Sequence, residues 1–300
     1  MTTFVLVFAS LLAGVFLQRM SVDTSRWISG LNGYIINFAL PALILANVPG
    51  LQLQADALFP MLMPWLLAGL AFAIAFALGK FLRWRLEQVL VVALLMGLGN
   101  TAFFGLPIVD LYLGPEAVAT AVIYDQLGSF LVLSLVATTS IALLSGAREA
   151  LDMQQMIWRV LSFPPFISLL VALLVPGSMV PALLAALFDL VGTTILPLAM
   201  LIVGLQLKIR IAPEHIQPML AVIGGKLLLT PLLVFYLGRV FAVEQGIQQA
   251  TFLQSAMPPM VTPAILLIAA GIAPGFVAST LGISTLVSFV TVPFWVYFFL

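Results

Sequence analysis

Two apolar stretches of this sequence are interrupted near their middles by polar and helix-breaking residues. Asn100 lies among three glycines in the stretch 88–112, and the adjacent Pro258 and Pro259 interrupt the stretch 247–271. Proline removes a backbone donor and clashes with the carbonyl four residues earlier, so neither stretch is expected to form a continuous helix. Half-helices that begin after such breaks present free N–H groups and a partial positive charge, which favours a carboxylate or another anionic group.

The alternative interpretation of these prolines is that they only kink helices for packing. We assign that role to the single prolines Pro41, Pro197 and Pro231. The two breaks differ from these because they occur at corresponding places in the two halves of the chain. Paired breaks of this kind are the strongest sequence indication of a transport site, because unwound backbone at membrane depth lines a cavity or is buried in protein.

Asp125 and Lys226 are ionisable residues deep within apolar stretches. Each lies roughly 13 Å from the nearer membrane face at 1.5 Å per residue. Charges at that depth are costly unless paired or hydrated, so both are candidates for function. They could pair with each other, Lys226 could meet a substrate carboxylate, or either could carry a proton. The alternatives are a structural ion pair and a snorkelling lysine. Asp110 and Asp189 lie nearer the outer surface and are expected to be solvated.

No cofactor or metal site is predicted, because the chain has no cysteine and its single histidine, His215, has no partner. Four side chains near the breaks could offer oxygens to a sodium ion: Asn100, Thr101, Gln254 and Ser255. Neither break contains an acidic residue, so a tight sodium site is not indicated. Proton coupling through Asp125, or uncoupled export, is favoured over sodium.

The elements that position these residues must be membrane helices. The chain of 300 residues is 63% hydrophobic and 7% charged, whereas soluble domains average about 45–50% and about 25%. Lipid must therefore replace water around much of the protein. Zero net charge gives no indication of a nucleic-acid partner. The absence of zinc-protease, nucleophile-elbow and ATP-loop motifs argues against an enzyme.

Apolar runs long enough to span a bilayer, about 17–25 residues, predict an all-α protein with ten transmembrane helices. These are approximately 2–18, 28–48, 58–79, 88–112, 117–145, 157–176, 181–205, 217–241, 247–271 and 275–299. With both termini outside, nine basic residues fall in or beside cytoplasmic loops, as the positive-inside rule requires. They are Arg19, Arg26, Lys80, Arg83, Arg85, Arg148, Arg159, Lys208 and Arg210. Arg239 alone falls in an outside loop.

The two halves of the sequence resemble each other. Pro107 matches Pro263 at an offset of 156 residues, and 115–130 matches 274–289 at an offset of 159 with six identities in sixteen positions. Five spans in each half force the second copy to enter the membrane from the opposite face, which is the inverted repeat of many secondary transporters. The predicted five-helix repeats are 1–150 and 151–300.

Three segments resemble the auxin efflux carrier family of membrane transporters in its short bacterial form: Gly99-Asn100-Thr101 with Gly105-Leu106-Pro107, Tyr124-Asp125-Gln126, and Met257-Pro258-Pro259. The resemblance covers the whole chain. It implies a fold related to bile-acid/sodium symporters, in which helices 4 and 9 cross at their breaks within a crossover domain beside a scaffold domain. The substrate-binding candidates are Asn100, Thr101, Gly105, Pro107, Gln126, Met257, Pro258, Pro259, Thr262 and Pro263.

The resemblance implies a carrier of a small organic anion, such as malate or malonate, in the bacterial cytoplasmic membrane, moving with an elevator-like motion. The long central loop of the plant members is absent, so auxin is not expected as the substrate. The alternatives are a sodium-coupled symporter of the bile-acid type and, in another class, a membrane-embedded enzyme or receptor. The expected partners are the anion and the lipid bilayer, and a homodimer remains open.

Overall fold

The computed structural model describes residues 2–20, 24–49, 55–146, 153–176, 179–206 and 212–300. Three of the basic residues used for the orientation, Arg148, Lys208 and Arg210, lie outside these ranges. Within them the chain is helical, and its β-type pairing is a single bridge between Gly99 and Pro259. The all-α prediction is therefore confirmed for the described residues.

Six described helices are long and apolar enough to cross a membrane, which makes this a multi-pass membrane protein. They are Arg26–Asn47, Leu58–Leu82, Pro115–Ser145, Ala182–Gln206, Pro213–Val240 and Pro274–Phe299. Shorter apolar helices cover Leu86–Gly97, Thr101–Leu113 and Pro164–Leu174. The number of ten spans and the inverted repeat stay predictions.

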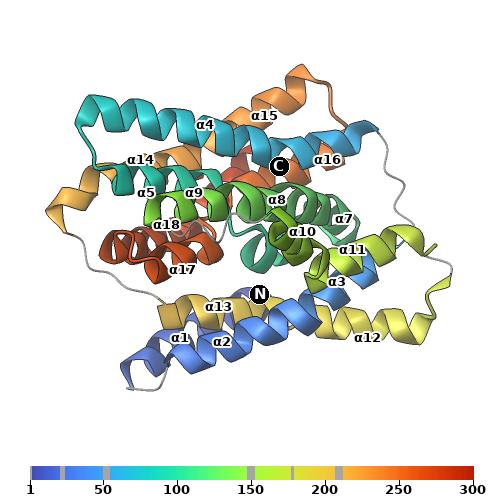
Figure 1. Ribbon diagram of the computed structural model, residues 1–300. Coiled ribbons are helices and arrows are strands. Elements are labelled where there is room, and N and C mark those ends of the chain that lie inside the picture. Colours follow the sequence, from blue (N-terminus) through green and yellow to red (C-terminus); the bar gives the residue numbers. More distant parts are fainter. Residues whose placement is uncertain (1, 21–23, 50–54, 147–152, 177–178, 207–211) are drawn as a thin grey trace.

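The helices form two groups that lie one above the other in Figure 1. The smaller group contains α1 (Thr2–Arg19), α2 (Thr24–Tyr34), α3 (Leu40–Asn47), α11 (Pro164–Leu174), α12 (Ala182–Gly192) and α13 (Ile195–Gln206). The larger group contains α4 (Leu58–Leu82), α5 (Leu86–Gly97), α6 (Leu106–Leu113), α7 (Pro115–Ile123), α8 (Phe130–Val132), α9 (Thr138–Ser145), α14 (Ile216–Gly224), α15 (Thr230–Val240), α16 (Gln245–Ser255), α17 (Val261–Ala269) and α18 (Pro274–Phe299). Between them, α10 (Met153–Leu161) packs on α11 and on Leu133–Ala137.

Within the smaller group, α1 and α13 touch backbone to backbone. A side chain on Gly14 would collide with the Leu201 carbonyl and the Gly204 backbone, and one on Gly204 would collide with the Leu11 carbonyl. Membrane helices gain little from burying apolar surface, so close packing at small residues is how they associate. The two glycines therefore fix one rigid pair of helices.

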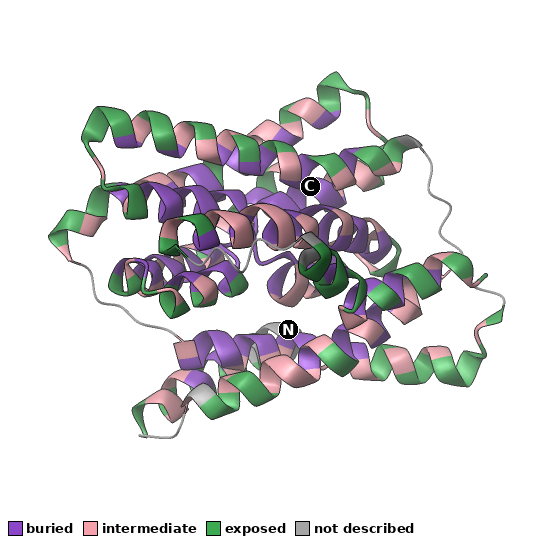
Figure 2. Ribbon diagram, viewed as in Figure 1, coloured by how far each residue is buried: buried purple, intermediate pink, exposed green. Residues whose placement is uncertain are grey.

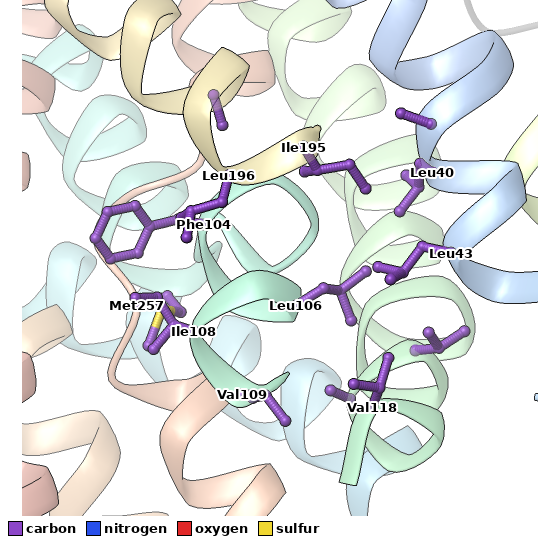
Figure 3. Close-up of a cluster of buried hydrophobic side chains, with 14 of the residues drawn as sticks. Leu40, Leu43, Phe104, Leu106, Ile108, Val109, Val118, Ile195, Leu196 and Met257 are labelled. Carbon is purple, nitrogen blue, oxygen red and sulfur yellow. The ribbon is translucent and has the colours of Figure 1, made fainter. Parts of the chain in front are cut away.

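The contact between the two groups is apolar (Figure 3). Leu40 and Leu43 of α3 and Ile195 of α13 face Leu106 of α6 and Val118 of α7, all within one buried cluster. Buried residues lie mainly inside the larger group and along this contact, whereas the outward sides of α4 and α12 are exposed (Figure 2). Because exposed positions there include large apolar side chains, they suit contact with lipid.

Three of the helices widen into π-helical turns just before a proline. Ile35–Ala39 precedes Pro41, Thr101–Gly105 precedes Pro107 and Gly225–Leu229 precedes Pro231. A proline cannot donate to the carbonyl four residues earlier and its ring crowds that carbonyl, so the preceding turn opens. The kinks predicted at Pro41 and Pro231 thus have a local cause, while the helix containing Pro197 is interrupted earlier, by a turn at Thr193–Thr194.

Candidate functional site

Both predicted helix breaks are present in the structure. In the first, α5 ends at Gly97 and helix resumes only at Thr101. In the second, α16 ends at Ser255 and α17 begins at Val261. Four half-helix ends therefore converge on two short unwound segments within the larger group.

The two unwound segments cross and bond to each other. The Asn100 backbone N–H donates to the Pro258 carbonyl at 2.7 Å, and the Met260 N–H donates to the Leu98 carbonyl at 2.9 Å. These bonds form the single antiparallel bridge of the described chain. Protein rather than lipid thus satisfies the freed backbone groups, as membrane depth demands.

A buried carboxylate lies at the N-terminal end of the half-helix that begins at Thr101. The Thr101 hydroxyl donates to Asp125 Oδ1 at 2.5 Å, and Gln126 Nε2 donates to Asp125 Oδ2 at 2.6 Å. All three side chains are buried. Negative charge is favourable at a helix N-terminus, where backbone N–H groups lack intrahelical partners. Asp125 and Gln126 also belong to the π-helical segment Tyr124–Ser129, which no proline explains, and such segments are frequent at functional sites.

Asn100 occupies the N-cap position of the same half-helix, but its side chain does not cap it. Its exposed fraction is 5%. An amide that is almost buried and makes no capping bond is free to contact a ligand at the crossing. The contact between Asn100 and a substrate stays a prediction.

A buried ammonium lies at a helix C-terminal end, in contrast to the N-terminal end that Asp125 contacts. Lys226 has an exposed fraction of 1%, and its Nζ donates to the Ser255 carbonyl at 2.9 Å. The Thr230 hydroxyl shares its single proton between the same carbonyl, at 3.0 Å, and the Lys226 carbonyl, at 2.7 Å. Lys226 therefore does not snorkel, and it does not pair with Asp125, whose two oxygens are bonded to Thr101 and Gln126.

The close approach of the two broken spans depends on a glycine. A side chain at Gly105 would collide with the Gln254 amide oxygen and approach Met257. Gln254 Nε2 donates to the Ala121 carbonyl at 3.2 Å, while its Oε1 is buried and has no partner among the described residues. Gln126 Oε1 is also buried and has no hydrogen-bond partner among the described residues. Two unsatisfied buried acceptors near the crossing are costly unless water or a ligand donates to them.

The remaining predicted site residues differ in burial. Met257, Pro258, Pro259 and Pro263 are buried in the second broken span. Thr262 is exposed, two residues after Met260, whose N–H takes part in the crossing, and its substrate contact stays a prediction.

A cavity of about 470 Å³ lies between the two helix groups, on the side of α6. Pro107, two residues beyond Gly105, lines it together with Asp110 and Asp189. Both carboxylates are exposed, as the sequence predicted. The cavity also contacts Leu43 of α3, so it opens where the groups meet.

Sequence reasoning missed Thr230. It lies four residues after Lys226, on the same helix face, and both side chains reach the Ser255 carbonyl. The four-residue spacing from Lys226 could have identified Thr230 from the sequence. His215, which was assigned no metal role, stacks on Phe276 with ring centroids 4.9 Å apart. The described residues contain no group of three or more side chains suited to hold a metal ion.

Comparison with known proteins agrees with this architecture. A family model described as membrane transport protein matches residues 1–296. A protein of Methanothermobacter thermautotrophicus named as an uncharacterized transporter is 26% identical over 298 residues, covering 96% of this chain and 95% of that protein. Both likenesses run through the two breaks and the residues around them.

Proposed function

Because the chain belongs to the membrane transport protein family, as its likeness to auxin efflux carriers predicted, we propose that it is a secondary transporter of a small organic anion with a carboxylate group. Its membrane is the bacterial cytoplasmic membrane, with both termini outside. The function is transport and not catalysis, in keeping with the family and with the transporter relative.

One observation carries the proposal: two broken helices cross through the Asn100–Pro258 and Met260–Leu98 hydrogen bonds. Crossings of discontinuous helices at membrane depth are where secondary transporters hold their substrates. The half-helix that starts at Thr101 directs free N–H groups toward the crossing, and the unbonded Asn100 amide stands beside it. Lys226 adds a positive charge. This combination suits a carboxylate.

The motion that we propose follows from the two helix groups. The ten spans form two inverted repeats, 1–150 and 151–300, and the larger group is the crossover domain that moves against the smaller group as scaffold. The apolar contact of Figure 3 supports a sliding interface, because few directional bonds have to break there. A homodimer that immobilises the scaffold is compatible with this scheme.

A sodium-coupled symporter is the main competing function. Two of the side-chain oxygens that could bind sodium already take part in hydrogen bonds: the Thr101 hydroxyl donates to Asp125 and the Ser255 hydroxyl donates to the Phe252 carbonyl. This favours coupling to protons through Asp125, or uncoupled export, over sodium coupling.

The proposal is tested by ligand-dependent thermal unfolding of the purified protein with malate, malonate, longer dicarboxylates and aromatic acids. A ligand that binds only the folded state raises the unfolding temperature in a saturable way. Asn100→Ala is expected to weaken binding of the stabilising anion about tenfold or more, because loss of a buried hydrogen bond costs about 1–3 kcal/mol. Unchanged affinity would remove Asn100 from the site.

Asn37→Ala is the matched control, since Asn37 is an exposed asparagine of the smaller group, in the widened turn Ile35–Ala39. It is expected to retain the parental affinity. Stabilisation by no organic anion, together with uptake of an uncharged solute by reconstituted protein, would contradict the proposed substrate class.

A further inference from the structure

The sequence leaves the last carbonyl of α16 without its usual backbone hydrogen-bond donor. In a continuous helix the Ser255 carbonyl would accept the N–H of residue 259, but that residue is a proline and has none. Instead the carbonyl accepts a bond from Lys226 Nζ at 2.9 Å, and the Thr230 hydroxyl lies 3.0 Å from it while its single proton is also within reach of the Lys226 carbonyl at 2.7 Å. A helix C-terminus carries a partial negative charge, so a cation there is stabilised.

A second half-helix end lies against the same ammonium. A Cβ atom built on Gly99 would stand only 3.0 Å from Lys226 Nζ. Gly99 lies two residues after Gly97, the last residue of α5. The ammonium thus occupies the space between the C-terminal ends of α5 and α16, where the partial negative charges of both half-helices meet.

No carboxylate neutralises this ammonium among the described residues. Its one hydrogen bond there is to the Ser255 carbonyl, although an ammonium has three donors. Asp125, the buried acid of the site, is bonded to Thr101 and Gln126 at the N-terminal end of the other half-helix. The two charges are therefore sorted by helix polarity and are not paired with each other.

In transporters built from discontinuous helices, unwound carbonyls and half-helix C-terminal ends are the groups that coordinate a coupling cation. Carbonyl and hydroxyl oxygens are also the ligands that hard cations prefer. The Ser255 carbonyl and the Thr230 hydroxyl are two such oxygens, and the Lys226 ammonium is bonded to the first of them.

We propose that Lys226 is a resident cation, which fills a latent metal-cation site at the crossing and makes this carrier independent of sodium. This inference rests on the proposed transport function in one respect only, because independence from sodium is a statement about what drives transport. The site itself is defined by the Ser255 carbonyl, the Thr230 hydroxyl and the close approach of Gly99. Without the lysine, a sodium ion could enter the space and neutralise the same helix ends.

The experiment compares thermal unfolding of the full-length purified protein in sodium chloride and in choline chloride at equal ionic strength. Lys226→Ala removes the charge and leaves room for an ion, whereas Lys226→Met removes the charge and fills the room with an apolar chain. The alanine variant is expected to unfold at a lower temperature in choline and to recover by several degrees, saturably, as sodium replaces choline. The wild type and the methionine variant are expected not to distinguish the two salts.

Lys80→Met is the matched control, because Lys80 is exposed near the end of α4 and its loss removes one positive charge elsewhere. An alanine variant that does not respond to sodium overturns the proposal, and so does a wild type stabilised by sodium as strongly as that variant. If the alanine variant can be purified in folded form only from sodium-containing buffer, that result supports the proposal. If that variant cannot be obtained in either salt, sodium-stimulated uptake by the wild type overturns the proposal and equal uptake in both salts supports it. The unfolding comparison uses no substrate, so an error in the proposed anion leaves it intact.

Discussion

At the scale of single residues, each of the two buried charges contacts a helix end that carries the opposite partial charge. Asp125 accepts a bond from Thr101, the first residue of one half-helix, and Lys226 donates to Ser255, the last residue of another. Each charge is thereby stabilised by backbone dipoles. A charged pair in direct contact would need no such ends, so this arrangement leaves each charge able to respond separately to a substrate or a proton.

Asp125 is the residue that we expect to carry a coupled proton. Asp125→Asn keeps the shape of the side chain and an acceptor for the Thr101 hydroxyl, but it cannot bind or release a proton in the physiological range. Uptake into proteoliposomes by this variant is therefore expected to be insensitive to an imposed pH gradient, while anion binding persists. The measurement is initial uptake with and without the gradient.

Asp110→Asn is the control for this prediction, since Asp110 is an exposed acid of the cavity between the helix groups. It is expected to keep the parental response to the gradient. Were Asp125→Asn to show the parental response as well, Asp125 would not be the coupling group.

The sequence identified both charges but not their partners. An aspartate and a lysine in apolar stretches stand out by composition alone, because burying either is costly. Lys226 and Ser255 are 29 residues apart in the chain, and their contact depends on how α15 packs against α16. The exposure of Thr262 could not be foreseen either, because it depends on which face α17 turns toward its neighbours.

At the scale of elements, prolines 258 and 259 act by withholding hydrogen-bond donors. Changing both to Ala supplies N–H groups for the Gln254 and Ser255 carbonyls, so α16 can extend across the break. Proline in a helix interior costs about 3 kcal/mol relative to alanine, so the extended helix is favoured locally. Extension would displace the Pro258 carbonyl that accepts the Asn100 N–H. Transport is expected to fall at least about tenfold, with an unfolding temperature that is unchanged or higher.

Pro41→Ala is the companion variant, because Pro41 lies in the smaller group and follows a widened turn far from the crossing. Uptake close to the wild-type rate is expected for it. Wild-type turnover by the Pro258→Ala, Pro259→Ala double variant would show that the break is not part of the working site.

The breaks were predictable because proline and glycine chemistry is local. The π-helical segment Tyr124–Ser129 was not, since no proline or glycine pair precedes it and its widening depends on packing against α4 and α7. Local propensity therefore explains where helices stop and where three of them widen before a proline, but it does not explain the widening at Tyr124–Ser129.

At the scale of the whole molecule, function requires that the two helix groups move relative to each other. Their membership could not be derived from hydrophobicity, because every span is apolar, and the family resemblance implied only that helices 4 and 9 belong to the crossover domain. The structure adds the contacts: α1 locks onto α13 through Gly14 and Gly204, and α3 and α13 present leucine and isoleucine to α6 and α7. The smaller group is thus tied within itself more tightly than to its neighbour.

This difference in attachment predicts which cross-links stop transport. Phe130 of α8 stacks on Phe163, which precedes α11, with ring centroids 4.2 Å apart, so this pair bridges the two groups. Tyr34 and Thr194 hydrogen-bond at 3.3 Å within the smaller group.

The chain has no cysteine, so cysteine pairs can be introduced at each place without a background reaction. A short bifunctional thiol reagent across positions 130 and 163 is expected to abolish uptake, and the same reagent across 34 and 194 to leave it largely intact. Each double variant before cross-linking serves as its own reference for the loss of the native side chains. Full uptake by protein that is completely cross-linked at 130 and 163 would mean that transport needs no relative movement at that contact, and the elevator-like motion would have to be abandoned.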